Sequence, residues 1–466
     1  MKLGNIIENT GAIILKGNTE TEITSICNDS RKVVAGSLFI AVKGFASDGH
    51  QFVDAAMQAG AAAAVSADRK ALSLIACNFY DNPSRKLKLV GITGTNGKTT
   101  TVTLLYNLFR SLGYECGLLS TIANYVGSRR SDTANTTADP ITINSLMSEM
   151  AEAGCEYCFM EVSSIGVEQD RVAGLDFNVG IFSNLTHDHL DYHKTFAEYL
   201  RCKKLFFDNL SPEAWAITNA DDKNGLVMVQ NTRAKVMTYS CRAAADHCGR
   251  ILEESFEGMQ LKVDDSEVWT RLVGSYNAYN VMAIYCAAIA LGVSKDEALL
   301  ALSKLGSAPG RFEVLAGPNG INVIIDYAHT PDALENVLNT LRSVAPEKEL
   351  ICLFGCGGDR DKTKRPEMGK IAEQLADRIV VTSDNSRTEK TEDIMEDIRK
   401  GMSPKAKAMF IADRCEAIRS AIMTAPEGAT ILLAGKGHET YQIIGTEHRH
   451  FDEREIVNEV YQTLTA

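Results

Sequence analysis

Short apolar runs alternate with helix-like segments along most of the chain. Between residues 87 and 307 the runs are LVGIT, CEYCFMEV, NVGIFSNL and AWAITNA, and between 308 and 466 they are INVIIDYA, ELICLFGC, DRIVVTSD, AMFIAD and ATILLAG. Such alternation is typical of a mostly parallel sheet covered by helices. The pattern therefore predicts an α/β fold with two such sheets, of which the second is doubly wound and Rossmann-like.

The first 86 residues form a separate block. It contains a strand-like run, SLFIAV, after Gly36, and then a helix-like segment, HQFVDAAMQAGAAAAV. A chain of 466 residues is too long for one ordinary core, and its length predicts about three domains. We expect these domains to span residues 1–86, 87–307 and 308–466.

Composition and charge narrow the class of protein. A hydrophobic content of 45% with 23% charged residues is that of a globular protein, and no run of 18 apolar residues predicts a membrane span. The N-terminus, MKLGNIIENTG, lacks the apolar core of a signal peptide, so we expect a cytoplasmic protein. The net charge of −12 argues against a nucleic-acid partner.

A glycine-rich loop, GITGTNGKTT at residues 91–100, lies between an apolar run and a helix-like stretch. Glycines let backbone N–H groups approach phosphate oxygens, and the helix N-terminus adds partial positive charge. Lys98 would contact the terminal phosphates, and the Thr99 hydroxyl would bind the accompanying magnesium. The general P-loop pattern has its first glycine where this chain has Ile92, but the strand-loop-helix context still predicts ATP binding. The expected loop residues are Gly94, Thr95, Asn96, Gly97, Lys98, Thr99 and Thr100.

Two further strand ends in the same block carry polar side chains. Glu161 ends the run CEYCFMEV and could ligate magnesium, although a plain surface acid is the alternative. The run NVGIFSNL leads into THDHLDYH, in which three histidines and two aspartates fall within residues 187–193. Zinc is possible on composition, but the nearby phosphate loop favours magnesium.

The third block has four polar, glycine-bearing loops after its strands: DYAHTPD, FGCGGDRD, TSDNSR and AGKGHE. A doubly wound sheet binds ligands at the carboxyl ends of its strands, so these loops predict one composite site. Thr330, Pro331 and Asp332 predict a helix start directly after the first loop.

These motifs together resemble those of the Mur ligases, and in particular the UDP-N-acetylmuramoyl-tripeptide synthetases of that family. The resemblance extends over nearly the whole chain and rests on NDSRKVVAGSLFIAVKG, DGHQF, TGTNGKTT, NTTADP, MEVSS, NLTHDHLDYH, GSYNAYN, GRFE, DYAHTPDALENVL, FGCGGDRDKTKRPEMG, TSDNSR and GKGHETYQ. It implies a three-domain fold with a P-loop central domain. It also implies an ATP-dependent amide ligase of peptidoglycan precursor synthesis that acts through an acyl phosphate.

The resemblance assigns roles to individual residues. Lys98, Lys203 and His189 are implied as catalytic, with Thr99, Glu161, His189 and Lys203 (as a carbamate) holding Mg²⁺; without the resemblance, Lys203 is a helix-surface lysine. Around ATP it adds Asn277, Arg311 and Asp326. For the UDP-sugar dipeptide it implies Ser30, Asn135, Thr136, Thr137, Ser163, Gln169 and Arg171. For the incoming amino acid it implies Arg360, Asp384, Asn385, Arg387, Gly435 and Glu439.

The loop TSDNSR resembles the family's loop associated with meso-diaminopimelate. Arg387 would pair with the distal carboxylate of that amino acid and Glu439 with its distal ammonium, whereas lysine has no distal carboxylate. The sequence departs from the family's pattern in three places: Ser386 replaces a proline, Ile165 replaces a histidine, and the first block is short. These departures weaken the transfer of the family's residue roles to this chain.

Several alternatives stay open at this point. The enzyme could use L-lysine or another diamino acid, it could be a folylpolyglutamate-type ligase, or it could be a homologue that binds nucleotide without ligating. The motifs NDSRKVVAGSLF and DYAHTPDALENVL speak against the folylpolyglutamate type. We expect a monomer with small-molecule substrates and no membrane partner.

Overall fold

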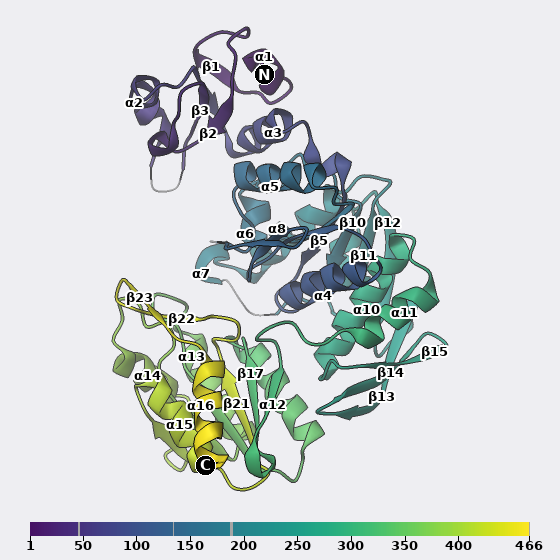
Figure 1. Cartoon of the computed structure of the whole chain (residues 1–466), viewed down its shortest axis with the longest axis vertical. Helices are drawn as coiled ribbons and strands as arrows, with labels where there is room; N and C mark the ends of the chain where they lie inside the picture. Colours follow the sequence, from purple (N-terminus) through teal and green to yellow (C-terminus); the bar gives the residue numbers. More distant parts are fainter. Residues whose placement is uncertain (45–46, 134, 187–189, 466) are drawn as a thin grey trace.

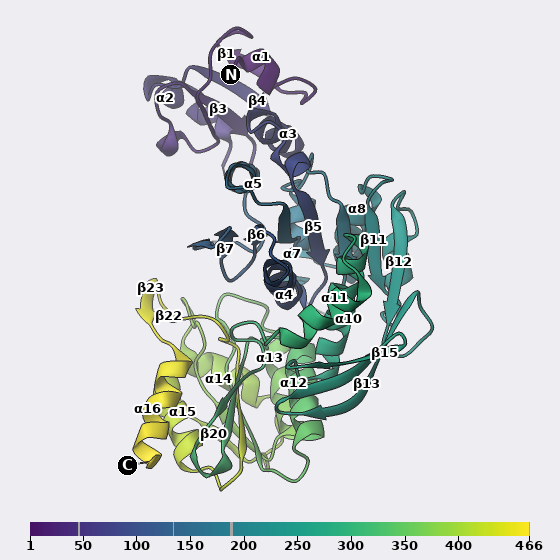
Figure 2. The same cartoon turned by 45° about the vertical axis from the view of Figure 1, so that its right-hand side comes forward.

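The computed structural model describes residues 1–44, 47–133, 135–186 and 190–465. Each of three successive parts of the chain has its own sheet, and the N-terminal and C-terminal parts lie at opposite ends of the central one (Figures 1 and 2). The three-part α/β architecture is therefore as predicted. The boundaries at residues 86 and 307 stay predictions.

The N-terminal unit has a four-stranded sheet with the order β1-β4-β3-β2, in which only β1 is antiparallel to its neighbour. Its strands are β1 (Ile13–Lys16), β2 (Ser25–Cys27), β3 (Ser37–Val42) and β4 (Ala63–Ala67). Its helices are α1 (Leu3–Ile6), α2 (Val53–Gln58) and α3 (Arg69–Phe79). The strand predicted from SLFIAV is confirmed as β3.

The helix expected over residues 50–65 is wrong in its second half. Helix α2 ends at Gln58, and the alanine-rich segment that follows forms β4 in the interior of the sheet. A short apolar run without alternation fits a buried strand as well as a buried helix, so the pattern alone could not separate them.

The central unit has an eleven-stranded sheet with the order β15-β14-β13-β12-β11-β10-β5-β9-β6-β7-β8. The strands from β13 to β6 pair in parallel, and antiparallel hairpins extend both edges. The strands are β5 (Lys88–Thr93), β6 (Cys116–Leu119), β7 (Asn124–Val126), β8 (Arg129–Ser131), β9 (Tyr157–Glu161), β10 (Val179–Phe182), β11 (Trp215–Asn219), β12 (Lys235–Ser240), β13 (His247–Ser255), β14 (Gly258–Val263) and β15 (Ser266–Thr270). The predicted parallel strands are confirmed, and the edge hairpins were not predicted.

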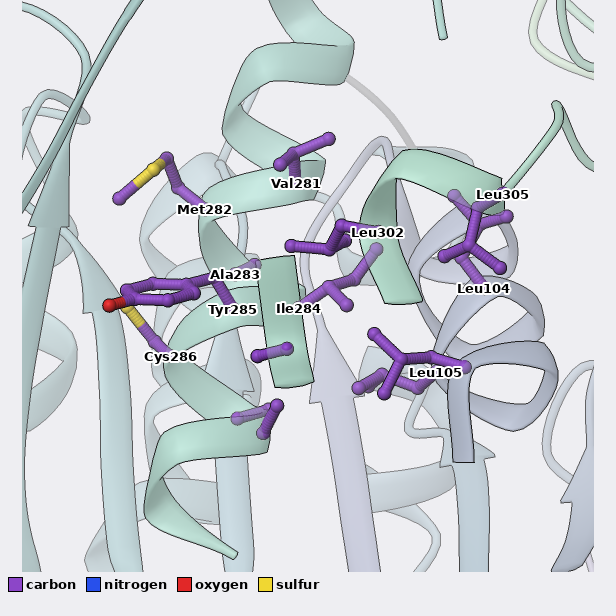
Figure 3. Close-up of a cluster of buried hydrophobic side chains, with 14 of the residues drawn as sticks. Leu104, Leu105, Val281, Met282, Ala283, Ile284, Tyr285, Cys286, Leu302 and Leu305 are labelled. Atoms are coloured by element: carbon purple, nitrogen blue, oxygen red, sulfur yellow. The ribbon is translucent and has the colours of Figure 1, made fainter. Parts of the chain in front are cut away.

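Two groups of helices bury the two faces of this sheet. Helices α4 (Lys98–Ser111), α10 (Ser275–Ala290) and α11 (Lys295–Lys304) pack on one face. Helices α5 (Pro140–Glu152), α6 (Ser164–Glu168), α8 (Phe196–Asp208) and α9 (Gly225–Val229) pack on the other. The short α7 (Leu190–His193) precedes α8. Figure 3 shows side chains of α4, α10 and α11 meeting in the first of these clusters.

The C-terminal unit has a six-stranded sheet with the order β16-β17-β21-β18-β19-β20, and only β16 is antiparallel to its neighbour. Its strands are β16 (Glu313–Ala316), β17 (Asn322–Asp326), β18 (Leu350–Phe354), β19 (Arg378–Val381), β20 (Ala408–Phe410) and β21 (Thr430–Ala434). A separate hairpin joins β22 (Tyr441–Ile444) and β23 (Glu447–His450).

Helices cover both faces of the C-terminal sheet, which makes it doubly wound as predicted. Helices α12 (Pro331–Val344), α13 (Lys364–Leu375) and α14 (Thr391–Arg399) cover one face, and α15 (Arg414–Met423) and α16 (Glu453–Thr465) cover the other. The predicted start of α12 is confirmed, because the Thr330 side chain accepts a hydrogen bond from the N–H of Ala333. Over the described residues, we find no helix whose length and apolar character would let it cross a membrane.

The cluster between α10 and α11 yields a stability prediction. Leu302 of α11 is fully buried against the same cluster as Ile284, whereas Leu300 of the same helix is 60% exposed. We expect Leu302→Ala to lower the free energy of unfolding by ~2–5 kcal/mol, because it leaves a cavity in a close-packed core. Leu300→Ala should change it by less than ~0.5 kcal/mol. Thermal and denaturant unfolding would measure both, and equal effects of the two variants would contradict this assignment of the core.

Candidate active site

The glycine-rich loop joins β5 to α4, as predicted. Gly97 is the residue before α4 and has a φ of +88°, and a Cβ there would lie 2.5 Å from Oδ1 of Asn280. Glycine is therefore required both by backbone conformation and by the approach of α10. The Lys98 ammonium donates to the carbonyls of Gly94 (2.9 Å) and Thr95 (2.8 Å), so it lies over the loop. This geometry presents the N-terminus of α4 and a cation to one anionic ligand.

The strands on either side of β5 bring two more polar groups to this loop. β9 and β10 both pair in parallel with β5, so their carboxyl ends lie at the same edge of the sheet. Asn184, after β10, accepts from the N–H of Asn96 (2.9 Å) and donates to its carbonyl (3.1 Å). His189, which the sequence predicts to hold Mg²⁺, lies outside the described residues, as do His187 and Asp188.

Glu161, the last residue of β9, has an incompletely bonded carboxylate. It is 1% exposed, and its Oε1 accepts from the N–H of Thr121 (2.8 Å). Its Oε2 is buried and has no hydrogen-bond partner among the described residues. A buried carboxylate oxygen at the wall of a phosphate site fits a hard divalent cation such as Mg²⁺. The alternative of a surface acid is wrong.

Lys203 lies beneath the phosphate loop. It belongs to α8, is 1% exposed, and its Nζ donates to the carbonyl of Gly94 (2.7 Å) and lies 4.6 Å from the Tyr199 ring centroid. The alternative of a helix-surface lysine is therefore wrong. Helix α8 carries this side chain to the same loop that Lys98 covers.

A cavity of about 240 Å³ lies between the central and C-terminal units. The phosphate loop and Glu161 line it from one side, and Arg311 and Tyr327 line it from the other. Arg311 donates to the Thr99 hydroxyl (3.3 Å), and its guanidinium lies 4.5 Å from the Tyr327 ring centroid. The Asn96 amide donates to Asp332 of α12 (2.7 Å), which adds a second bond between the two units.

Two other residues predicted to bind nucleotide also line this cavity, but their polar groups already have partners. Asn277 donates to the carbonyl of Val273 (2.7 Å) and accepts from Asn280 (2.8 Å). The carboxylate of Asp326 accepts from the N–H groups of Phe312 and Ala328, and burial raises its pKa while Arg311 opposes that rise. These two side chains shape the cavity wall. Sequence reasoning missed Tyr327 and Asn280, although DYAHTPD and GSYNAYN contain them.

A second cavity, of about 790 Å³, lies between the N-terminal and central units. Ser30 lines it from the N-terminal unit, and Asn135, Gln169 and Arg171 line it from the central unit. Four of the residues predicted for the UDP-sugar dipeptide are therefore brought together. Arg31 and Arg69 also line this cavity and were not predicted.

The other three residues predicted for that substrate do not line the second cavity: one lines the first cavity, and two bond the backbone near the end of β9. Thr136 lines the first cavity, and its hydroxyl accepts from Thr121 (3.0 Å). The Thr137 hydroxyl donates to the carbonyl of Glu161 (2.9 Å). The Ser163 hydroxyl accepts from the N–H of Gly166 at the start of α6 (3.0 Å). Thr137 and Ser163 therefore hold the segment after β9.

The loops after β19 and β21 bring most of the predicted amino-acid residues together. Asn385 donates to the Glu439 carboxylate (2.9 Å). The fully buried Lys436, which was not predicted, has its Nζ 3.1 Å from Glu439 and 3.8 Å from Asp384. Burial raises the pKa of Glu439, and Lys436 opposes that rise. A Cβ on Gly435 would lie 2.8 Å from the Asp384 carboxylate, so glycine permits this close approach.

Arg387 and Arg360 occupy the outer side of this group. The Arg387 guanidinium donates to the carbonyl of Gly358 (2.8 Å), and exposed Arg360 donates to the carbonyl of Asp359 (3.1 Å). Burial first, and then Glu439, raise the pKa of Tyr441, while Arg387 lowers it. Tyr441 therefore lies within electrostatic range of both an anion and a cation at this site.

Comparisons with known proteins agree along the whole chain. Residues 22–91 match the Mur ligase family catalytic domain, residues 92–288 the Mur ligase middle domain, and residues 310–437 the Mur ligase glutamate ligase domain.

Several full-length relatives of this chain share a name. A "UDP-N-acetylmuramoyl-L-alanyl-D-glutamate--2,6-diaminopimelate ligase" of Cytophaga hutchinsonii is 49% identical and covers 100% of both chains. One of Parabacteroides distasonis is 49% identical over 99% of both. A solved structure of a ligase with the same name is 30% identical, with a TM-score of 0.72 over 100% of this chain and 99% of that one. The chain therefore belongs to the Mur ligase family.

Proposed function

We propose that this protein is an ATP-dependent ligase that joins meso-diaminopimelate to UDP-N-acetylmuramoyl-L-alanyl-D-glutamate in peptidoglycan precursor synthesis. The observation that carries the proposal is the cavity lined by the phosphate loop, Glu161 and Arg311, which come from two units of the chain. The names of the full-length relatives support the substrates.

The reaction follows from what these groups can do. ATP transfers its γ-phosphoryl group to the γ-carboxylate of the D-glutamate, because a free carboxylate is a poor acyl donor to an amine. The amine of the incoming amino acid then attacks the acyl carbon, an amide forms, and inorganic phosphate leaves. Lys98 and Arg311 would hold the phosphates and offset their charge. Positioning and charge stabilisation account for most of the rate in such transfers.

Magnesium binding is proposed at the edge of the sheet near the loop. Glu161 supplies a buried oxygen that has no partner among the described residues, Thr99 supplies a hydroxyl, and we assign His189 and carbamylated Lys203 to the same group. A bound Mg²⁺ would neutralise phosphate charge. Carbamylation would convert the buried Lys203 ammonium into an anion, which removes a cation from the vicinity of the metal.

We assign the two other substrates to opposite sides of the cavity that is lined by the phosphate loop. The UDP end of the sugar dipeptide would lie in the second cavity beside Ser30 and Arg171, and Thr136 would lie toward the reacting carboxylate. The amino acid would lie at Arg387 and Glu439. We also propose domain boundaries near residues 86 and 307, a monomer, and a cytoplasmic location; the three separate sheets support the boundaries.

The remaining alternatives are specific enough to test. Two alternatives remain: a ligase that uses L-lysine, and a homologue that binds nucleotide without ligating. The names of the relatives disfavour the third alternative, a folylpolyglutamate-type ligase. Phosphate release, measured with UDP-N-acetylmuramoyl-L-alanyl-D-glutamate and a panel of diamino acids, separates them. We expect release that depends on both substrates and is fastest with meso-diaminopimelate.

Lys98→Ala should reduce phosphate release at least ~100-fold, because it removes a cation from the developing phosphate charge. Its thermal unfolding should stay close to that of the wild type, since Lys98 is only half-buried and its ammonium donates to the loop carbonyls of Gly94 and Thr95. Lys304→Ala, at the exposed end of α11, is the matched control and should be fully active. A Lys98→Ala variant with near-normal phosphate release would overturn the assignment of the loop.

Lys203→Ala should be nearly inactive and should regain part of its activity when short carboxylic acids are added, because they can replace a carbamate in the vacated space. Lys204→Ala removes the neighbouring lysine, which pairs with Asp208 (2.6 Å), and should keep activity. Activity with and without acetate is the measurement. Full activity of Lys203→Ala without any acid would contradict the carbamate proposal.

Arg387→Ala should lose most of the preference for meso-diaminopimelate over L-lysine. Losing a bidentate arginine–carboxylate contact costs ~2–3 kcal/mol, or roughly 30- to 150-fold in kcat/KM. Arg449→Ala, in the exposed part of the nearby hairpin, is the control and should keep the preference. The ratio of kcat/KM for the two amino acids is the measurement, and a wild-type ratio near one would exclude Arg387 as a selector.

A further inference from the structure

Two residues of the loops after β18 and β19 have left-handed backbone conformations. Asp359 has a φ of +54° and Arg387 a φ of +51°. Such values are uncommon for residues other than glycine and persist only when surrounding contacts enforce them. The contacts that enforce them connect the two loops.

A buried arginine forms the base of this connection. Arg365, in the first turn of α13, is fully buried. Its guanidinium donates to both carboxylate oxygens of Glu389 (3.0 and 2.9 Å), to Asp397 (3.0 Å), and to the carbonyl of Gly357 (3.2 Å). One side chain therefore contacts the loop after β18, the loop after β19, and α14.

Glu389 extends the connection to the strained residues. Its Oε1 also accepts from the N–H of Asp359 (2.6 Å). The Asp359 carboxylate accepts from the N–H (3.2 Å) and the hydroxyl (2.7 Å) of Thr388. Arg365 and then Lys362 hold the pKa of Glu389 down at about 2, so this acceptor stays ionised.

The loop sequence around Arg387 fits closely against its neighbour. A Cβ on Gly358 would overlap the carbonyl oxygen of Ser386, so the two backbones can approach only because residue 358 is glycine. The Ser386 hydroxyl bonds that of Thr391 (2.7 Å). The Arg387 backbone bonds the hairpin through Ile443 (3.2 Å) and Gly445 (2.8 Å).

We propose that Glu389, anchored by Arg365, is a positioning residue that fixes the Arg387 guanidinium and thereby sets the selectivity for the amino-acid substrate. This inference rests on the proposed function, in which Arg387 pairs with the distal carboxylate. Glu389 sets the position of residues 357–359 against residues 386–389, and Arg387 donates to the carbonyl of Gly358. A shift between the loops moves that guanidinium, and bidentate pairing tolerates little displacement.

Glu389→Gln tests the inference, with Lys362→Ala as the matched control. Lys362 bonds the same carboxylate (2.8 Å) but is 64% exposed, so its loss should leave Arg365 and Glu389 in place. We expect Glu389→Gln to lower the ratio of kcat/KM for meso-diaminopimelate to that for L-lysine by ~10- to 100-fold, as displaced binding groups do. The KM for ATP should be unchanged, and Lys362→Ala should keep the wild-type ratio.

The other results have distinct meanings. If Arg387→Ala loses the preference while a folded Glu389→Gln keeps it, this inference is overturned and the proposed function stands. If wild type and Arg387→Ala show the same ratio, selection by Arg387 is wrong, and the inference with it. Should Glu389→Gln unfold at a lower temperature, Thr388→Val removes the hydroxyl bonded to Asp359 from an exposed position. That variant should also lower the ratio, and an unchanged ratio would overturn the inference.

Discussion

Parallel strands place their carboxyl ends along one edge of a sheet, and this constraint organises the chemistry of the protein. In the central sheet, β5, β9 and β10 are neighbours, so the phosphate loop, Glu161 and Asn184 meet although 90 residues separate the first from the last. In the C-terminal sheet the same rule collects the loops after β17, β18, β19 and β21. The phosphate loop and the loop after β17 line one cavity, and bonds from Arg311 to Thr99 and from Asn96 to Asp332 join the two units there.

Burial of charge is the second constraint, and it determines which partners the charged side chains need. A buried ion is costly unless it is paired or hydrogen-bonded. Arg414 is fully buried and meets the rule with Glu453 and the carbonyls of Ser383 and Ala434. These bonds connect the carboxyl ends of β19 and β21 to α15. Glu161 is equally buried and lines the phosphate cavity, where one of its oxygens has no described partner, so a cation bound in that cavity would complement it.

The proposed amino-acid site shows how the two constraints act together. Lys436 is one cation beside two acidic side chains, Asp384 and Glu439, an arrangement that would suit the ammonium of the proposed amino-acid substrate. Arg387 supplies the opposite charge at the outer side. Its left-handed backbone bonds Ile443 and Gly445 of the hairpin, and the Ser386 hydroxyl bonds that of Thr391, so the loop has support although residue 386 is not proline.

The sequence by itself determined the local elements that carry the chemistry. These are the phosphate loop, the parallel strands, the start of α12, and the loops of the C-terminal sheet. These features are local, because glycine, proline and caps act on their own backbone, and apolar runs of strand length alternate with helices.

Only the tertiary structure decided the rest. It made Ala63–Ala67 a strand, because neighbours on both sides bury it. It buried Lys203 beneath the loop instead of on a helix surface. It also placed Tyr327 in the cavity wall, Lys436 beside Asp384 and Glu439, and Arg365 against Glu389. Whether a charged side chain is solvated or buried depends on what packs against it from distant segments, and local pattern does not contain that information.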